Sequence, residues 1–134
     1  MTTAYRSARI VVQNSTNDLL TIEGAEVLLG EWVRGGGAQS GDVIDRQCAR
    51  AFVTESTVLQ RGTEAYVRLG SISGYVHVRW YLPWVGDFVC TAEGTAALQC
   101  ERVTVLDEEP AAVAALITLV IDRNRCERTA KDKP

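Results

Sequence analysis

The residues best suited to chemistry lie together in one stretch, residues 74–90, with the sequence GYVHVRWYLPWVGDFVC. This stretch holds two of the three tryptophans, two of the four tyrosines and the only histidine of the chain. Tyrosine and tryptophan each join an apolar ring to a polar group, so they favour membrane interfaces and also suit the ring of a sugar. The stretch therefore indicates noncovalent binding of a lipid headgroup or a sugar.

A catalytic site has little support from the residue types present. A Ser-His-Asp or Cys-His site needs a histidine, and His77 lies between Val76 and Val78 in a strand-like pattern that is more typical of a structural or surface residue. Carboxylates occur in pairs, but none has a spacing that would fix two of them across a sugar. We therefore do not expect an enzyme.

The cysteines and glycines form no cofactor motif. No pair among Cys48, Cys90, Cys100 and Cys126 has CxxC spacing, and a single histidine cannot complete a usual zinc site. Residues 35–41 are rich in glycine but lack the lysine and the Ser/Thr of a phosphate-binding loop. We expect neither a structural metal nor a cofactor.

The redox state of the cysteines has two readings. Cys90 and Cys100 flank a hairpin-like segment, so they could face each other and form a disulfide. The alternative is that all four cysteines are reduced and buried, as is common in intracellular proteins. The spacing alone does not decide between the two.

A strand must position most of the aromatic side chains. The alternation before Pro83 places two sets on opposite faces: Tyr75, His77, Arg79 and Tyr81 on one, and Val76, Val78, Trp80 and Leu82 on the other. The apolar set predicts that Trp80 fills the core. Proline and glycine then predict a loop over residues 82–87. This loop makes Trp84 the best candidate for a contact residue, because binding residues concentrate on loops held by a rigid sheet.

The rest of the chain predicts further short strands separated by turns. The expected strands are residues 8–14, 19–33 with a break at Gly24 and a bulge at Gly30, 42–44, 49–54, 63–69, 88–90, 99–106 and 117–121. Residues 91–98 read as a turn, and the alanine-rich residues 109–116 could form a short helix. We expect an all-β, single-domain β-sandwich over residues 1–134, with about 8–10 mostly antiparallel strands, at most one short helix, and flexible ends at residues 1–7 and 123–134.

Composition limits the partners. The chain has 134 residues and is 46% hydrophobic, enough for one core. Its net charge of −3 argues against nucleic acid, which needs a concentrated basic surface. The start of the sequence lacks a secretory signal pattern, and the apolar run 111–121 is too short to span a membrane. We expect a soluble protein, cytoplasmic or released by a non-classical route.

Three segments, taken in order, carry a family resemblance. The first is residues 9–14 (RIVVQN), followed by residues 20–22 (LTI) and the strand end at residues 30–32 (GEW). The second is residues 52–56 (FVTES), leading to residues 61–67 (RGTEAYV). The third and most specific, residues 78–86 (VRWYLPWVG), resembles a Tyr-Trp-Asp-x-Pro-Trp/Tyr-x-Gly pattern. Together they resemble the aegerolysin family and its bacterial insecticidal crystal-protein relatives, which have a loose kinship to the actinoporins.

This resemblance has departures and implications. Tyr81 and Leu82 stand where the family has an acidic residue before the proline, Ala65 replaces a glycine and Asp87 an asparagine, and Gln60 or Arg61 stands where an acidic lipid-contact residue is usual. The family implies a β-sandwich that binds membrane lipids, often sphingolipids, and often acts as a cytolysin with a perforin-like, pore-forming partner.

The resemblance also implies which residues bind. The lipid-facing end would be shaped by five aromatic residues, Trp32, Trp80, Tyr81, Trp84 and Phe88. Nearby polar groups would be Glu55, Arg61 and Glu64, with Arg79 paired to a phosphate oxygen. Two other readings stay open: a lectin-like sandwich that binds carbohydrate, and a structural protein that forms homo-oligomers through an edge strand.

Overall fold

The computed structural model of the chain describes residues 4–95 and 97–121. Every regular element within these ranges is a β-strand. The strands are β1 (Arg6–Asn14), β2 (Leu20–Leu29), β3 (Glu31–Trp32), β4 (Val43–Ile44), β5 (Ala49–Ser56), β6 (Thr63–Ser71), β7 (Gly74–Leu82), β8 (Val89–Gly94), β9 (Leu98–Glu108) and β10 (Ala112–Ile121). Within the same ranges, no helix is long and apolar enough to cross a membrane.

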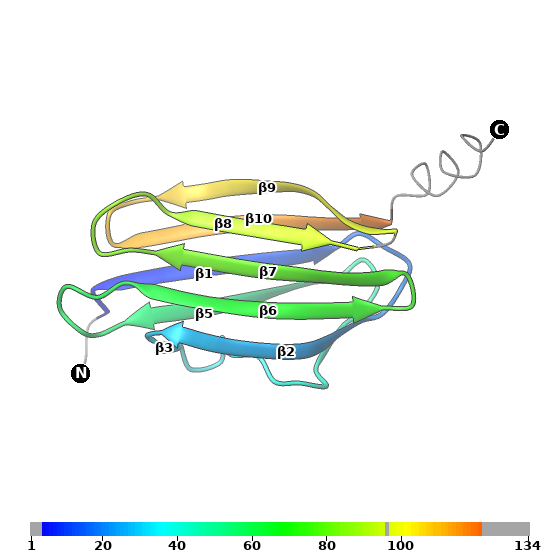
Figure 1. The fold of residues 1–134 in the computed structure, drawn as a ribbon, viewed down its shortest axis with the longest axis horizontal. Helices are drawn as coiled ribbons and strands as arrows, with labels where there is room; N and C mark the ends of the chain where they lie inside the picture. The colour runs from blue at the N-terminus through cyan, green and yellow to red at the C-terminus, as the bar shows by residue number, and fades with distance from the viewer. Residues whose placement is uncertain (1–3, 96, 122–134) are drawn as a thin grey trace.

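The strands form two five-stranded sheets that face each other as a sandwich (Figure 1). One sheet has the order β3-β5-β1-β10-β9 and the other the order β4-β2-β6-β7-β8. Neighbouring strands are antiparallel except for β1 and β10, which are parallel. The expected all-β sandwich of mostly antiparallel strands is thus confirmed.

Alternation along the strands builds the core between the sheets. Along β7 the predicted apolar face is buried and the opposite face is only partly covered. Strands β1, β6 and β10 alternate in the same way. The core consists mainly of aliphatic side chains around the two large rings of Phe52 and Trp80. Because successive side chains point to opposite faces of a strand, this period of two fixes which residues can reach solvent.

The short helix considered for residues 109–116 is wrong. Those residues form a tight turn and then the start of β10, whose Val113, Ala115, Ile117 and Leu119 are all buried. Helix propensity of alanine is a weak preference that tertiary packing overrides. Here β10 lies between β1 and β9, so its backbone hydrogen-bonds on both sides.

Other strand boundaries also differ from the prediction. Residues 91–94, read as part of a turn, continue β8, because the small inward-facing Cys90, Ala92 and Gly94 fit beside β7. Strand β2 runs through Gly24, where its register against β6 shifts. Strand β1 begins at Arg6, inside the end expected to be flexible, whereas residues 123–134 lie outside the described residues.

Candidate functional site

Four connections and the first residues of β1 meet at one end of the sandwich, on the left in Figure 1. We call this the loop end; it comprises residues 5–6, Gly30, the β5–β6 loop (57–62), the β7–β8 loop (83–88) and the β9–β10 turn (109–111). The registers place the end of β2 and of β7 beside the start of β6, and the start of β10 beside the start of β1. The loop predicted to carry contact residues is therefore central to this end.

Trp84 is fixed at the loop end by the start of β1. The guanidinium carbon of Arg6 lies 4.0 Å from the centre of the indole ring, and Arg6 Nη2 donates a hydrogen bond of 2.8 Å to the Trp84 carbonyl oxygen. Tyr5 packs edge-on against the same ring, with 6.0 Å between ring centres. A cation over an indole face and a charged hydrogen bond both stabilise this loop.

The loops also touch through their backbones. A Cβ added at Gly62 would lie 2.2 Å from the Leu82 carbonyl oxygen, so only glycine allows the β5–β6 loop to approach the β7–β8 loop this closely. A Cβ at Gly30 would lie 2.3 Å from the Glu55 carbonyl oxygen, and Gly30 has a φ of 87°. The buried hydroxyl of Thr63 donates a 3.0 Å hydrogen bond to the Leu29 carbonyl. These contacts hold the loops of the loop end in fixed positions relative to one another.

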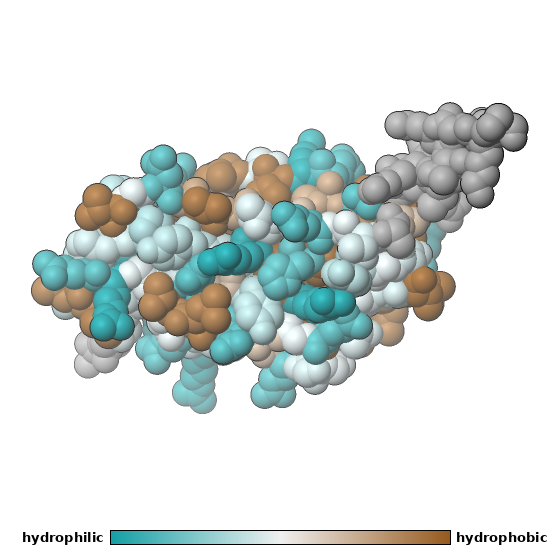
Figure 2. Space-filling model, viewed as in Figure 1, coloured by the Kyte–Doolittle hydropathy of each residue, from teal (hydrophilic) through white to brown (hydrophobic). Residues whose placement is uncertain are grey.

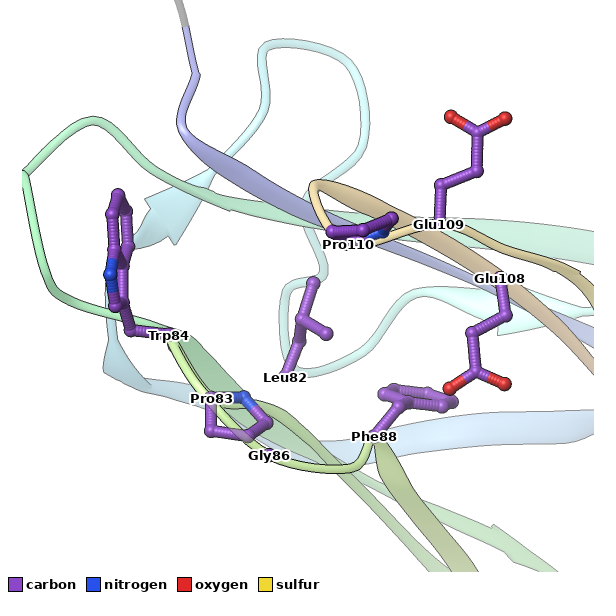
Figure 3. A pocket seen from close by; sticks show the side chains of 8 residues that line it. All are labelled: Leu82, Pro83, Trp84, Gly86, Phe88, Glu108, Glu109 and Pro110. Atoms are coloured by element: carbon purple, nitrogen blue, oxygen red, sulfur yellow. The ribbon is translucent and has the colours of Figure 1, made fainter.

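Three hollows lie between the loops. One, of about 340 Å³, is lined by Leu82, Pro83, Trp84, Gly86, Phe88, Glu108, Glu109 and Pro110 (Figure 3). Figure 3 shows the Trp84 indole turned away from Phe88, on the far side of Pro83. A second, of about 350 Å³, lies between Tyr81, Trp84, Val85 and Arg61. A third, of about 190 Å³, also has Arg61 in its wall, with Val58. Arg61 therefore stands between two hollows.

Aliphatic side chains project from the two central loops. Val58 and Leu59 on the β5–β6 loop are 53% and 61% exposed, and Val85 on the β7–β8 loop is 84% exposed. Sequence reasoning missed all three, and it missed Tyr5 and Arg6. The available signal was the presence of aliphatic residues inside turn segments, which are usually polar.

The structure brings together four of the predicted binding residues. Tyr81, Trp84 and Arg61 line one hollow, and Phe88 lines the hollow on the other side of Pro83. Tyr81 and Phe88 are half-buried, with Phe88 packed against the core. The guanidinium of Arg61 has no ionic partner among the described residues, and its side chain is exposed.

Trp80 and Trp32 do not reach this surface. Trp80 has no exposed area; its Nε1 donates a 3.0 Å hydrogen bond to Thr54 Oγ1, and its ring stacks on Phe52. In the folded chain Trp80 is therefore a core residue, as its place in the apolar alternation predicts. The ring of Trp32 lies 6.2 Å from that of Trp80 and faces a separate cavity with Asp42 and Arg50.

The remaining polar residues lie on or near the sheets. Arg79 pairs with Glu64 on the outer face of the β6–β7 pair, so its charge is already matched. Glu55 is half-buried on β5, opposite Ser7 of β1 and Glu31 of β3. Arg79, Glu64 and Glu55 line none of the three hollows described above.

Comparison with known proteins shows what shares this fold. No family model matches the chain, and no curated protein matches it. A solved structure does. It is the crystal structure of the lipid-binding protein Nakanori, which matches with a TM-score of 0.67 and 13% sequence identity over 85% of this chain and 70% of that chain. At that identity the match establishes a shared β-sandwich fold.

Of the two readings that the sequence leaves open for Cys90 and Cys100, the structure has the reduced one, since both are free thiols. The two residues lie on edge strands of different sheets, so they are not opposite each other in one hairpin. Burial, and then the neighbouring Cys100, raise the pKa of the Cys90 thiol from 9.0 to about 12. Burial likewise raises the pKa of Cys100. Cys48 is an exposed free thiol, and Cys126 lies outside the described residues.

Proposed function

We propose that the protein binds the surface of lipid membranes through its loop end. The observation that carries this proposal is the projection of Val58, Leu59 and Val85 from two adjacent loops. Exposed aliphatic side chains at loop tips gain free energy when they enter the apolar part of a bilayer. Scattered apolar residues on a surface are ordinary, but these three project from neighbouring loops at one end of the sandwich, and Val85 and Val58 line two hollows that share Arg61.

The groups beside these tips suit the interfacial layer of a membrane. Tyr81 and Trp84 combine rings with polar atoms, which favours the depth of the lipid headgroups. Arg61 lies between the aliphatic tips and lacks an ionic partner in the described chain, so its guanidinium can pair with a lipid phosphate. Arg79 is a weaker candidate for this role, because Glu64 already neutralises it.

Two further observations support the proposal. The fold is shared with a protein described as lipid-binding, although the identity of 13% transfers no binding residue. The bracing of the loops by Arg6 and Gly62 means that the tips can enter a bilayer without first losing much conformational freedom. A preorganised surface of this kind acts by binding, and the proposal requires no catalytic step.

The family resemblance adds finer proposals about the lipid and the action. The preferred lipid would be a sphingolipid, and the protein would act as a cytolysin with a perforin-like, pore-forming partner. Vesicles with and without sphingomyelin test the first point. Release of a trapped dye by the protein alone would contradict the need for such a partner.

The principal test is co-sedimentation with vesicles of phosphatidylcholine, sphingomyelin and cholesterol. Val85→Glu and Leu59→Glu should each weaken binding at least about tenfold, since a carboxylate at the tip must lose its hydration. Ile72→Glu is the matched control: Ile72 is 97% exposed on the β6–β7 turn, at the opposite end of the sandwich. Equal losses in the control, or no binding of the parent chain across a broad lipid panel, would overturn the proposal.

A second candidate function is carbohydrate binding at the cavity beside Trp32. This cavity, of about 380 Å³, places an indole near Asp42, whose carboxylate holds Arg50 at 3.1 Å and accepts the Gln39 N–H. An aromatic ring beside a fixed carboxylate suits a sugar ring. Binding to lipid-free glycans that is lost in Trp32→Ala and retained in Val85→Glu would favour this function.

A further inference from the structure

The edge strand β9 is the least protected edge of the two sheets. It has 11 residues and pairs with β10 on one side only, whereas the edges β3 and β4 have two residues each and β8 has six. Natural sandwiches shorten or shield their edges, because a free row of backbone N–H and C=O groups pairs with other chains. Three of the four edges follow this rule, and β9 does not.

Two apolar side chains on the inner face of β9 are exposed to solvent. Val103 lies opposite the buried Ile117, and Val105 opposite the buried Ala115, so both valines are on the inner face of their sheet. They are nevertheless 36% and 46% exposed. The facing edge strand β8 presents only small inward side chains there, Cys90 and Ala92, so the core is left open along this side. Figure 2 shows hydrophobic side chains along the upper edge, over β8 and β9.

Two bulges limit which part of β9 can pair. The register against β10 shifts twice and leaves Glu101 and Leu106 without opposite residues. Between them, residues 102–105 form a regular segment. Its outer face has Arg102 and Thr104, and Asp107 follows on the same face just past the second bulge, since it lies opposite Ala114. The segment thus has an apolar inner face and an outer face with a positive and a negative end.

We propose that β9 pairs with β9 of a second copy, antiparallel and about a two-fold axis at Thr104. In this arrangement Val103 lies beside Val105 of the second copy on the inner face, and the reverse pair repeats across the axis. Leu106 is the extra residue of a bulge, so it is left out of the pairing. Arg102 then lies beside Asp107 of the second copy on the outer face. The β3-β5-β1-β10-β9 sheets of the two copies become one continuous sheet, and the exposed valines enter a shared core.

A second copy fits this edge better than an unrelated strand does. A two-fold axis repeats every contact with the two copies exchanged. The pair of Arg102 with Asp107 and the pair of Val103 with Val105 therefore each occur twice across the seam. The edge is self-complementary in both charge and hydrophobicity, which is what an isologous interface requires. The antiparallel seam also directs the two loop ends in opposite directions. If the loop end binds lipid as proposed above, the dimer would therefore link two vesicles.

The test is sedimentation of the full chain, with a reducing agent present, from about 1 to 100 µM. The parent chain should show a monomer–dimer equilibrium. Arg102→Asp and Asp107→Arg should each raise the dissociation constant at least about tenfold, because each places two like-charge pairs across the seam. The double variant restores the opposite charges and should recover the parent value to within about threefold.

Arg9→Asp is the control, since Arg9 is an exposed arginine on the outer face of the interior strand β1. It should leave the dimer unchanged. A chain that is monomeric over the whole concentration range would overturn the proposal, as would a double variant as weak as the single ones. Sedimentation in the absence of lipid keeps this outcome independent of the proposed function.

Discussion

Arg6, at the start of the first strand, lies over the indole of Trp84, 78 positions later in the sequence, at 4.0 Å from the ring centre. The same guanidinium donates hydrogen bonds to the carbonyl oxygens of Trp84 and Tyr5, at 2.8 and 2.7 Å. One side chain therefore connects the N-terminal strand to the central loop of the candidate binding surface. The position of that loop depends on a residue that is remote in sequence.

Arg6→Met is expected to destabilise the protein by about 1–3 kcal/mol, since it removes a charged hydrogen bond and a cation–π contact. The substitution also removes the Nε of Arg6, which is buried without a hydrogen-bond partner in the described chain. Removing this unpaired group offsets part of the loss in stability. Urea denaturation measures the change. Arg9→Met removes an exposed arginine from the same strand and should change stability by less than about 0.5 kcal/mol. Equal effects of the two substitutions would contradict the role of Arg6.

Thr54→Val tests the polar contact inside the core. The buried Thr54 hydroxyl accepts the hydrogen bond of the Trp80 indole N–H at 3.0 Å, and valine has nearly the same shape without an acceptor. The unpaired N–H should cost about 1–3 kcal/mol of stability. Thr91→Val, at an exposed position of β8, should stay within about 0.5 kcal/mol of the parent. Thermal or urea unfolding that leaves the Thr54 variant as stable as the parent would exclude this contact.

Because the Cys90 thiol is buried, we predict that the protein loses stability at alkaline pH. Burial raises its folded-state pKa from 9.0 to about 12, so above pH 9 the unfolded chain releases this proton while the folded chain keeps it. This contribution is therefore fully present below pH 9 and declines as pH rises toward 12. Cys90→Ala lacks it, so the stability difference between parent and variant should shrink as pH rises from 9 toward 12. A difference that stays constant, measured beside Cys48→Ala, would contradict the assignment.

The sequence supports the prediction of the sheets better than that of the candidate site. In β7 the alternation of Val76, Val78 and Trp80 with polar neighbours has a period of two, and this local signal fixes both strand type and buried face. In β10 the alternation is present, but alanines occupy several positions and their helix propensity conceals it. Only the neighbouring strands β1 and β9 decide the conformation.

The loop end escaped prediction because it is made by contacts between distant segments. Trp84 could be placed on a loop from Pro83 and Gly86, whereas no local pattern relates Arg6 to that loop. The family resemblance places Trp32 with the other aromatic residues, whereas the fold turns it toward a different cavity. Residue type indicates what a side chain can bind, but only the register of the strands determines which side chains meet.

Gly62→Ala provides the sharpest test of the bracing between the loops. The added methyl group would lie 2.2 Å from the Leu82 carbonyl oxygen and 2.8 Å from Pro83 Cα, which are backbone atoms that cannot rotate away. The loops must separate, and we expect a loss of about 1–3 kcal/mol in stability together with weaker vesicle binding. Gly24→Ala is the matched control, since no atom lies within 4 Å of its Cβ position. It should be neutral or stabilise the protein by up to about 1 kcal/mol, because alanine restricts the unfolded chain. If Gly62→Ala behaves like Gly24→Ala in both urea denaturation and vesicle co-sedimentation, the close packing of these two loops does not govern the binding surface.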